Sequence, residues 1–423
     1  MTTRVNAPLP LSAATAPLSS SKLKVNLTIA FVVCFISIMF SGIASMLMSV
    51  YLPVAVKDLL GNVTEEKMNT VGAYINAVFI FGSMFGGFAW GFICDKTGRS
   101  KSVILSTAFY GLFTVLTALS SSWLMVGIYR FLTGFGVGGV LVTTNILVAE
   151  IWPEKKKAVA LGIVSAAMPV GFIIAGAMNN ILANWHNAFL TGIVPLAVAG
   201  FAVFALAESE SWKNHKYAAD SNVNFNKKSF APGYRKDLFT GSVIFGAMLI
   251  GLWAVFSWAP TWVQSITNDA AKAQSLRGLT MMTLAISGLA GSIVSGWIAN
   301  AIGVRNTMLM CFAGCFIMAF VVFKLNTAMT PLTFVEMGAL AFFFGISQGA
   351  LSVYIPGLFP TGVRATATGF CFNIGRLFTA TVVFFIGALV GFLGGYGNAI
   401  FIFSFIFLIG FAVTFFSKEK PKI

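Results

Sequence analysis

Charged side chains inside long apolar stretches are the residues of this sequence best suited to bind a solute. Arg376 lies twelve residues after the basic position Arg364, which predicts a place near the middle of a membrane-length helix. Neither that stretch nor the next contains an acid that could neutralise it. A guanidinium presents a planar set of donors that a carboxylate can match with two hydrogen bonds. Arg376 is therefore a candidate anion site, and the alternative is a structural bond to a carbonyl or to a distant acid such as Glu336.

Two further charges lie within apolar stretches. Arg130 is a second candidate for substrate binding, near one end of the stretch 123–149. Glu336 lies five residues past Pro331, and we expect it at a depth similar to that of Arg130. A carboxylate inside the membrane could take up and release protons. The alternative is that Glu336 reaches headgroup water, since five residues of helix span only about 8 Å.

Neutral polar and aromatic side chains in other apolar stretches could complete a pocket around Arg376. Pockets for small molecules are mostly apolar, with a few placed polar groups and aromatic walls. The candidates for hydrogen bonds are Asn373, Asn145, Asn179, Gln264 and Gln348, and those for aromatic walls are Trp253, Trp258 and Tyr354.

The elements that must position these residues are transmembrane helices. The chain of 423 residues is 57% hydrophobic and 9% charged, with a mean hydropathy of +0.87, which excludes a soluble globular protein. Apolar segments of about 20 residues can cross a bilayer as helices. Twelve such segments occur, at 27–53, 71–94, 102–119, 123–149, 158–182, 187–207, 239–263, 278–299, 306–323, 331–356, 366–393 and 397–416.

The two sets of six segments are repeats of each other. Motifs in the first set return about 207 residues later, which is the pattern of a transporter built from two similar halves around a central site. The matched pairs include Gly138 and Gly345, Pro153 and Pro360, and Gly162 and Gly369; Gly91-x-x-x-Asp95-x-x-Gly98 returns as Gly296-x-x-x-Asn300-x-x-Gly303.

The net charge of +14 gives an orientation rather than a nucleic-acid surface. With the N-terminus inside, 20 of the 27 Lys and Arg residues fall on the inner side and five in outer loops, as the positive-inside rule requires. Those five are Lys57, Lys67, Lys272, Arg277 and Lys324. The predicted organisation is a disordered cytoplasmic tail (1–26), a six-helix half (27–207), a cytoplasmic linker (208–238), a second half (239–416) and a cytoplasmic tail (417–423).

A short charged loop between the second and third segments resembles the signature loop of the major facilitator superfamily. Its residues are Gly91, Asp95, Lys96, Gly98, Arg99 and Lys101. Finer motifs resemble the sugar-porter, aromatic-acid and organic-ion branches of that superfamily. They are Arg130-Phe-Leu-Thr-Gly134, Glu150 before Trp-Pro-Glu-Lys-Lys-Lys, Glu208-Ser-Glu-Ser-Trp212, and the run from Arg364 to Arg376.

The signature loop predicts a cytoplasmic gate. Glu150 is expected to pair with Arg99 and the nearby lysines and to favour the outward-open state. The gate candidates are Asp95, Arg99, Glu150, Lys157 and Arg364. In the second half Gly357 and Asn300 stand where the repeat predicts acids, so the second network is expected to be largely neutral. The alternative is that these loops simply pack without a role for charge.

The sequence thus predicts an all-α membrane protein of twelve helices in two pseudo-symmetric halves, which moves a small organic anion, a mono- or aromatic carboxylate, by alternating access. A sugar or neutral polyol carrier, and a sensor that transports nothing, are the alternatives. The sugar porters that it resembles carry an acid in the first helix, which this chain lacks, so proton coupling stays open. No metal, cofactor or catalytic cluster is predicted, so an enzyme is disfavoured. We expect a monomer in the inner (plasma) membrane of a bacterium, with both termini cytoplasmic.

Overall fold

The computed structural model describes residues 20–61, 63–209, 212, 232–267, 269–360 and 364–417, with the backbone alone at 20–26, 154–155, 157–159, 232, 270–271 and 364–366. Twelve helical segments in this part of the chain are long and apolar enough to cross a membrane, and no strand occurs in it. The twelve predicted spans and the all-α fold class are therefore confirmed.

The first half comprises α1 (Ser20–Leu60), α2 (Glu65–Thr97), α3 (Arg99–Ala118), α4 (Trp123–Ile151), α5 (Glu154–Ile181), and α6 (Trp185–Phe189) with α7 (Ile193–Ala205) as one broken span. The second half comprises α9 (Arg235–Ser265), α10 (Ala270–Ile302), α11 (Val304–Phe320) with the π-helical turn η4 (Val321–Leu325), α12 (Pro331–Gly357), α13 (Arg364–Ala388), and α14 (Tyr396–Ser404) with α15 (Ile406–Phe416).

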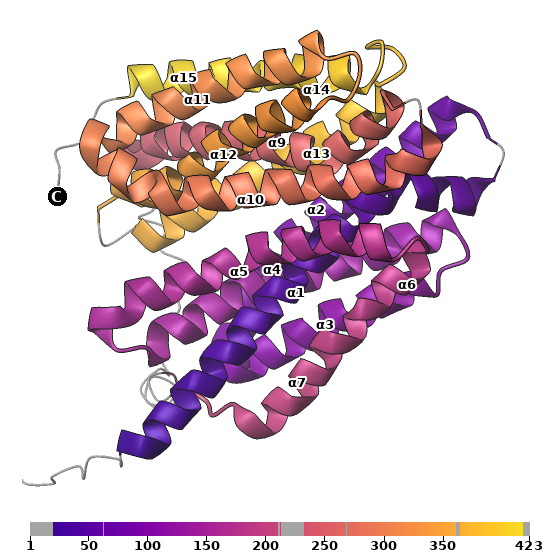
Figure 1. Cartoon of the computed structure of the whole chain (residues 1–423). Helices are drawn as coiled ribbons and strands as arrows, with labels where there is room; N and C mark the ends of the chain where they lie inside the picture. The colour runs from indigo at the N-terminus through magenta and orange to yellow at the C-terminus, as the bar shows by residue number, and fades with distance from the viewer. Residues whose placement is uncertain are drawn as a thin grey trace, which may run out of the picture.

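Helix packing in one half is repeated in the other. In the first half α2 packs on α4, α1 on α5, and α3 on α7. In the second half the corresponding pairs are α10 with α12, α9 with α13, and α11 with α15. Figure 1 shows the second half lying above the first. The sequence repeat therefore corresponds to a repeat of tertiary structure.

Glycines at repeated positions let these helices touch through their backbones. A Cβ atom on Gly138 of α4 would overlap the carbonyl oxygen of Ser83 in α2. A Cβ atom on Gly345 of α12 would overlap the carbonyl oxygen of Gly288 in α10. Small residues drive such close approach in membranes, where the lipid gives helices no hydrophobic reason to associate. The repeat of Gly138 at Gly345 is therefore explained by close helix packing in both halves.

The two halves are joined at one end of the bundle. We call the end at which α7 stops and α9 begins the linker end, and the opposite end, where α1 leads into α2, the far end (at the right in Figure 1). The hydrogen bonds that join described residues of the two halves all lie at the far end: Asn179 Nδ2 to Gln274 O, Gln274 Nε2 to Asn179 O (2.7 Å), Arg277 Nε to Val50 O (2.9 Å) and Tyr396 OH to Asn69 Oδ1. The far end is therefore the closed end in this conformation.

Candidate functional site

Arg376 lies on α13 where that helix packs against α2 of the other half. Its Nη1 donates to the Asn373 amide oxygen one turn earlier, at 3.2 Å. The closest approach to α2 is at Gly87, where a Cβ atom would lie 3.4 Å from both Arg376 Nη1 and Asn373 Oδ1. Arg376 is partly exposed, and no described carboxylate lies within ion-pair distance of it. Its guanidinium thus lies between the halves with a neutral partner only.

Arg130 occupies a different environment inside the first half. It is 1% exposed, and its Nη1 and Nη2 donate to the carbonyl oxygens of Ala44 (2.6 Å) and Ser45 (3.3 Å) in α1. The guanidinium also lies over the Phe79 ring, 4.1 Å from its centre. These contacts give Arg130 a structural role, because they hold α1, α2 and α4 together.

The structure does not gather all the predicted pocket residues around Arg376. Trp258 is fully buried seven residues before the far end of α9, where Nε1 donates to Val383 O at 3.1 Å. Gln264 is closer still to that end and accepts from Arg277. Tyr354 lies three residues before the linker end of α12, with its hydroxyl 2.6 Å from Ser417 Oγ. The expectation of one pocket containing these three side chains is wrong, because helix depth separates them.

Four of the predicted residues lie between the linker ends and the middles of their helices. Arg376, Asn373, Asn145 and Gln348 lie six to twelve residues from the linker ends of their helices, and all four are partly buried. Asn145 Nδ2 donates to Leu141 O at 2.6 Å within its own helix. Gln348 Nε2 is buried and has no hydrogen-bond partner among the described residues. A buried amide donor without a protein partner is suited to binding water or a ligand oxygen.

Glu336 lies in a polar corner at the far end of the second half. Its Oε2 accepts from Asn326 Nδ2 at 2.6 Å. Asn326 also donates to the carbonyl oxygens of Val321 and Val322 in the π-helical turn and accepts from Thr333 Oγ1. The Asn326 amide therefore supplies a local partner for the carboxylate, and no ion pair joins Glu336 to another described residue.

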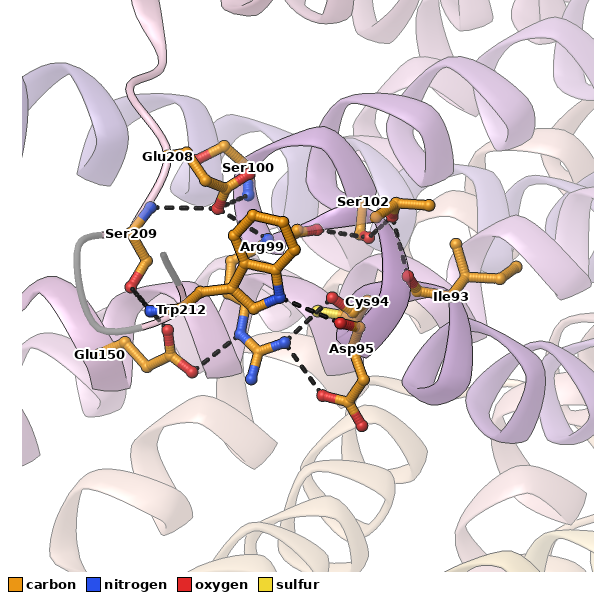
Figure 2. A network of polar contacts seen from close by, with 12 residues as sticks. Ile93, Cys94, Asp95, Arg99, Ser100, Ser102, Glu150, Glu208, Ser209 and Trp212 are labelled. Carbon is orange, nitrogen blue, oxygen red and sulfur yellow. Dashed lines mark hydrogen bonds and ion pairs between the residues drawn. The ribbon is translucent and has the colours of Figure 1, made fainter. Parts of the chain in front are cut away.

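The signature loop forms a network within the first half (Figure 2). Arg99 donates to Asp95 Oδ1 at 2.9 Å and to Glu150 Oε1 at 2.8 Å, so the structure brings these three gate candidates together. The side chains of Lys157 and Arg364 lie outside the described part of the chain. Because all described partners of Arg99 come from α2, α4 and the segment after α7, the network fixes one half and does not bridge to the other.

Glu208 completes this network, and the sequence analysis assigned it no role. Its Oε1 accepts from the backbone N–H groups of Arg99 (2.7 Å) and Ser100 (3.0 Å) at the start of α3. A carboxylate is favourable at a helix N-terminus. Gly98 has φ +110°, and a Cβ atom there would overlap the Glu208 carboxylate. The sequence signal for this contact was Gly98 of the signature loop. Spacing alone could not show which residue packs against that glycine.

Arg305 lies two residues after Gly303, the repeat mate of Gly98, and it has no described acidic partner. Its Nε donates to Thr414 O at 3.2 Å, and Nη2 donates to Phe415 O, at the C-terminal end of α15. A cation is favourable at the negative end of a helix dipole. In the described residues the charged network of the first half is thus replaced by an arginine–carbonyl contact in the second.

Arg277 was counted among the outer loop residues, and that assignment is wrong. It lies within α10 and is only 3% exposed. The first turns of α10 are polar, and the helix begins eight residues before the apolar segment at 278–299. Hydropathy alone therefore did not show that Arg277 belongs to a helix.

Comparison with known proteins identifies the family. The family model described as Major Facilitator Superfamily matches residues 33–381. The chain belongs to the Major Facilitator Superfamily. Among curated superfamily relatives, a cis,cis-muconate transport protein of Acinetobacter baylyi is 26% identical over 405 residues, covering 93% of this chain and 94% of that protein. A benzoate transport protein of the same organism is 25% identical, covering 80% and 78%.

Solved structures show the same fold. A xylose transporter from E. coli in an inward-open conformation has a TM-score of 0.77 and 14% sequence identity, with 94% of this chain and 97% of that chain covered. The superfamily fold thus extends over nearly the whole chain, in agreement with the resemblance of the signature loop.

Proposed function

We propose that this protein carries a small organic anion, a mono- or aromatic carboxylate, across the membrane by alternating access. The observation that carries the proposal is Arg376, a guanidinium between the two halves with a neutral described partner and no described acid near it. A charge-assisted, forked hydrogen bond to a carboxylate is the interaction such a group makes best. Relatives named as muconate, benzoate and gallate transporters support the same substrate class.

In this proposal three polar residues from the linker-end part of the bundle complete the site. Asn373 orients Arg376, while Asn145 and Gln348 offer amide groups for a second polar end of the ligand. A sugar or polyol would use such amides but would leave the arginine charge uncompensated. For that reason a carrier of neutral solutes is our second candidate. A sensor that transports nothing also stays an alternative, and we propose no catalytic activity.

The experiment that tests the substrate class is a thermal-shift screen of the purified protein. A ligand that binds the folded state raises the melting temperature by mass action. Benzoate and cis,cis-muconate should stabilise the protein at concentrations at which benzamide, xylose and choline do not. Stabilisation by xylose alone would favour the carrier of neutral solutes.

We propose that the linker end is cytoplasmic, in the inner membrane of a bacterium, with the protein acting as a monomer. The basic residues support this orientation, and moving Arg277 into the membrane lowers the outer count to four. In this orientation the conformation described above is closed towards the outside. Glu336 is the carboxylate that we propose as the candidate for proton coupling.

Two exposed lysines test the orientation. A cysteine replacing Lys272, at the far end, should react in intact cells with a maleimide that cannot cross the membrane. A cysteine replacing Lys96, at the linker end, should react only after the cells are opened. The five native cysteines are buried, so their background labelling should be low. The reverse labelling pattern would mean that the linker end faces outside.

Glu150 tests the proposed cytoplasmic gate. We propose that this network packs against the second half when the linker end closes; Glu150→Gln, which removes the charge that pairs with Arg99 at 2.8 Å, should then move the conformational equilibrium towards the inward-open state. Because the pair is partly exposed, we expect a shift of about twofold to fivefold. It would be measured as faster labelling of a cysteine at Gln348 and slower labelling of one at Ala73. Glu66→Gln, which removes an exposed far-end carboxylate, is the control. Equal labelling in both variants would show that the network has no role in gating.

A further inference from the structure

Arg277 is a buried arginine that bridges the two halves at the far end. It belongs to α10 of the second half, and its Nε donates to the Val50 carbonyl oxygen in α1 of the first half at 2.9 Å. Its Nη1 donates to the amide oxygen of Gln264 on the neighbouring helix α9. Both partners are neutral, and no described carboxylate lies within ion-pair distance of Arg277.

The bond to Val50 depends on the far end being closed. Around it α5 and α10 meet at Gly176 and Gly278, where a Cβ atom on Gly176 would lie 2.7 Å from the Gly278 carbonyl oxygen. Contact this close leaves no room for a solute to pass between the halves here. When the halves separate at this end, Arg277 must lose its partner in α1, while Gln264 remains beside it in the same half.

A guanidinium that loses half of its hydrogen bonds in a narrow opening needs a new acceptor. Water can supply one, but an anion supplies a stronger one, because attraction between opposite charges is added to the hydrogen bond. The other far-end cations are exposed to solvent: Lys57, Lys67, Lys324, and Lys272, which is paired with Asp269 at 3.3 Å. Arg277 is therefore the far-end cation whose need for an acceptor depends on the conformation.

We propose that Arg277 is a second anion-binding arginine, at the far-end entrance. Its guanidinium donates to the Val50 carbonyl oxygen when that end is closed and to an organic anion when that end is open. The inference rests on the proposed function, since it assigns an entry site to the same substrate class. It has a mechanistic consequence: an anion at Arg277 replaces the bond that closes the far end, so the substrate itself favours the open state on that side.

The test measures how anions change access to the far end. Ala73 is fully buried there, next to Gly387 of the other half, so a cysteine at Ala73 reports separation of the halves. In proteoliposomes we expect benzoate or cis,cis-muconate to increase the labelling rate of Ala73→Cys, and benzamide to leave it unchanged. Adding Arg277→Gln should raise the basal rate and reduce the apparent affinity of the anion effect about tenfold or more.

Two further variants make the outcome specific. Arg277→Lys keeps the charge but not the fork, so it should retain the anion effect with weaker affinity, and it serves if the glutamine variant fails to fold. Lys272→Gln removes an exposed cation from the same helix and should behave like the parent. An anion effect of equal affinity in the parent, Arg277→Gln and Arg277→Lys would overturn the inference while leaving the proposed function intact. If neither anion binds the parent protein in the thermal-shift screen, the proposed function fails, and the inference fails with it.

Discussion

Arg376→Gln should remove the preference of the protein for anionic over neutral ligands. Losing one partner of a buried charged pair costs about 2–5 kcal/mol, which corresponds to roughly 30-fold to several-thousand-fold in affinity. Asn373, which now accepts from Arg376, lies in the same helix, and the glutamine amide can donate to it, so we expect the variant to fold. The measurement is calorimetric or thermal-shift titration with benzoate and with benzamide, its neutral analogue.

A graded series separates charge from shape at this site. Arg376→Lys should bind benzoate more weakly than the parent but still prefer it to benzamide, because an ammonium group keeps the charge and loses the fork. Arg305→Gln removes an arginine of the same half that contacts helix-end carbonyls and the Phe415 ring, and it should leave both affinities unchanged. Parent-like benzoate affinity in Arg376→Gln would move the anion site elsewhere, with Arg130 as the next candidate.

Gly138→Val should lower the stability of the protein more than any other substitution proposed above. The new side chain would overlap the Ser83 carbonyl oxygen and approach the Gly87 backbone nitrogen, and neither atom can move without moving α2. Overpacking usually costs about 1–3 kcal/mol, and a clash with backbone belongs at the upper end or above. We expect a lower melting temperature and less monodisperse protein after extraction in detergent.

The control for that substitution is Gly162→Val in α5. A Cβ atom at Gly162 meets nothing within 4 Å, so the valine should be accommodated with little change in melting temperature. Equal destabilisation by both substitutions would mean that contact between α2 and α4 does not determine the effect.

Much of the fold could be predicted because the bilayer limits the possible structures. Hydrophobic length alone gives the spans, since every backbone polar group must be satisfied within the membrane. The repeat then gives the packing: Gly138 and Gly345 are echoes in the sequence and occupy equivalent helix contacts. Hydrophobic length does not fix the ends of the helices. For example, α10 begins eight residues before its apolar segment, which is why Arg277 was assigned to a loop.

The site could be predicted only in part, because the sequence gives depth but not direction around a helix. Arg376 and Arg130 both read as arginines inside the membrane, yet Arg130 finds two carbonyl acceptors in α1 and Arg376 faces the other half. Trp258 and Tyr354 were placed with them as aromatic side chains, although they pack near opposite ends of the bundle. Such partners come from helix contacts between distant segments, and no spacing rule reports them.

Uptake into proteoliposomes is the most direct test of the claim that this protein carries organic anions by means of Arg376. The measurement is the initial rate of entry of labelled benzoate, cis,cis-muconate and xylose, with the parent protein and with Arg376→Gln. We predict saturable entry of at least one of the two anions with the parent, strongly reduced entry with Arg376→Gln, and no saturable entry of xylose. Saturable uptake of xylose without uptake of either anion, or anion uptake that is unchanged in Arg376→Gln, would contradict the account.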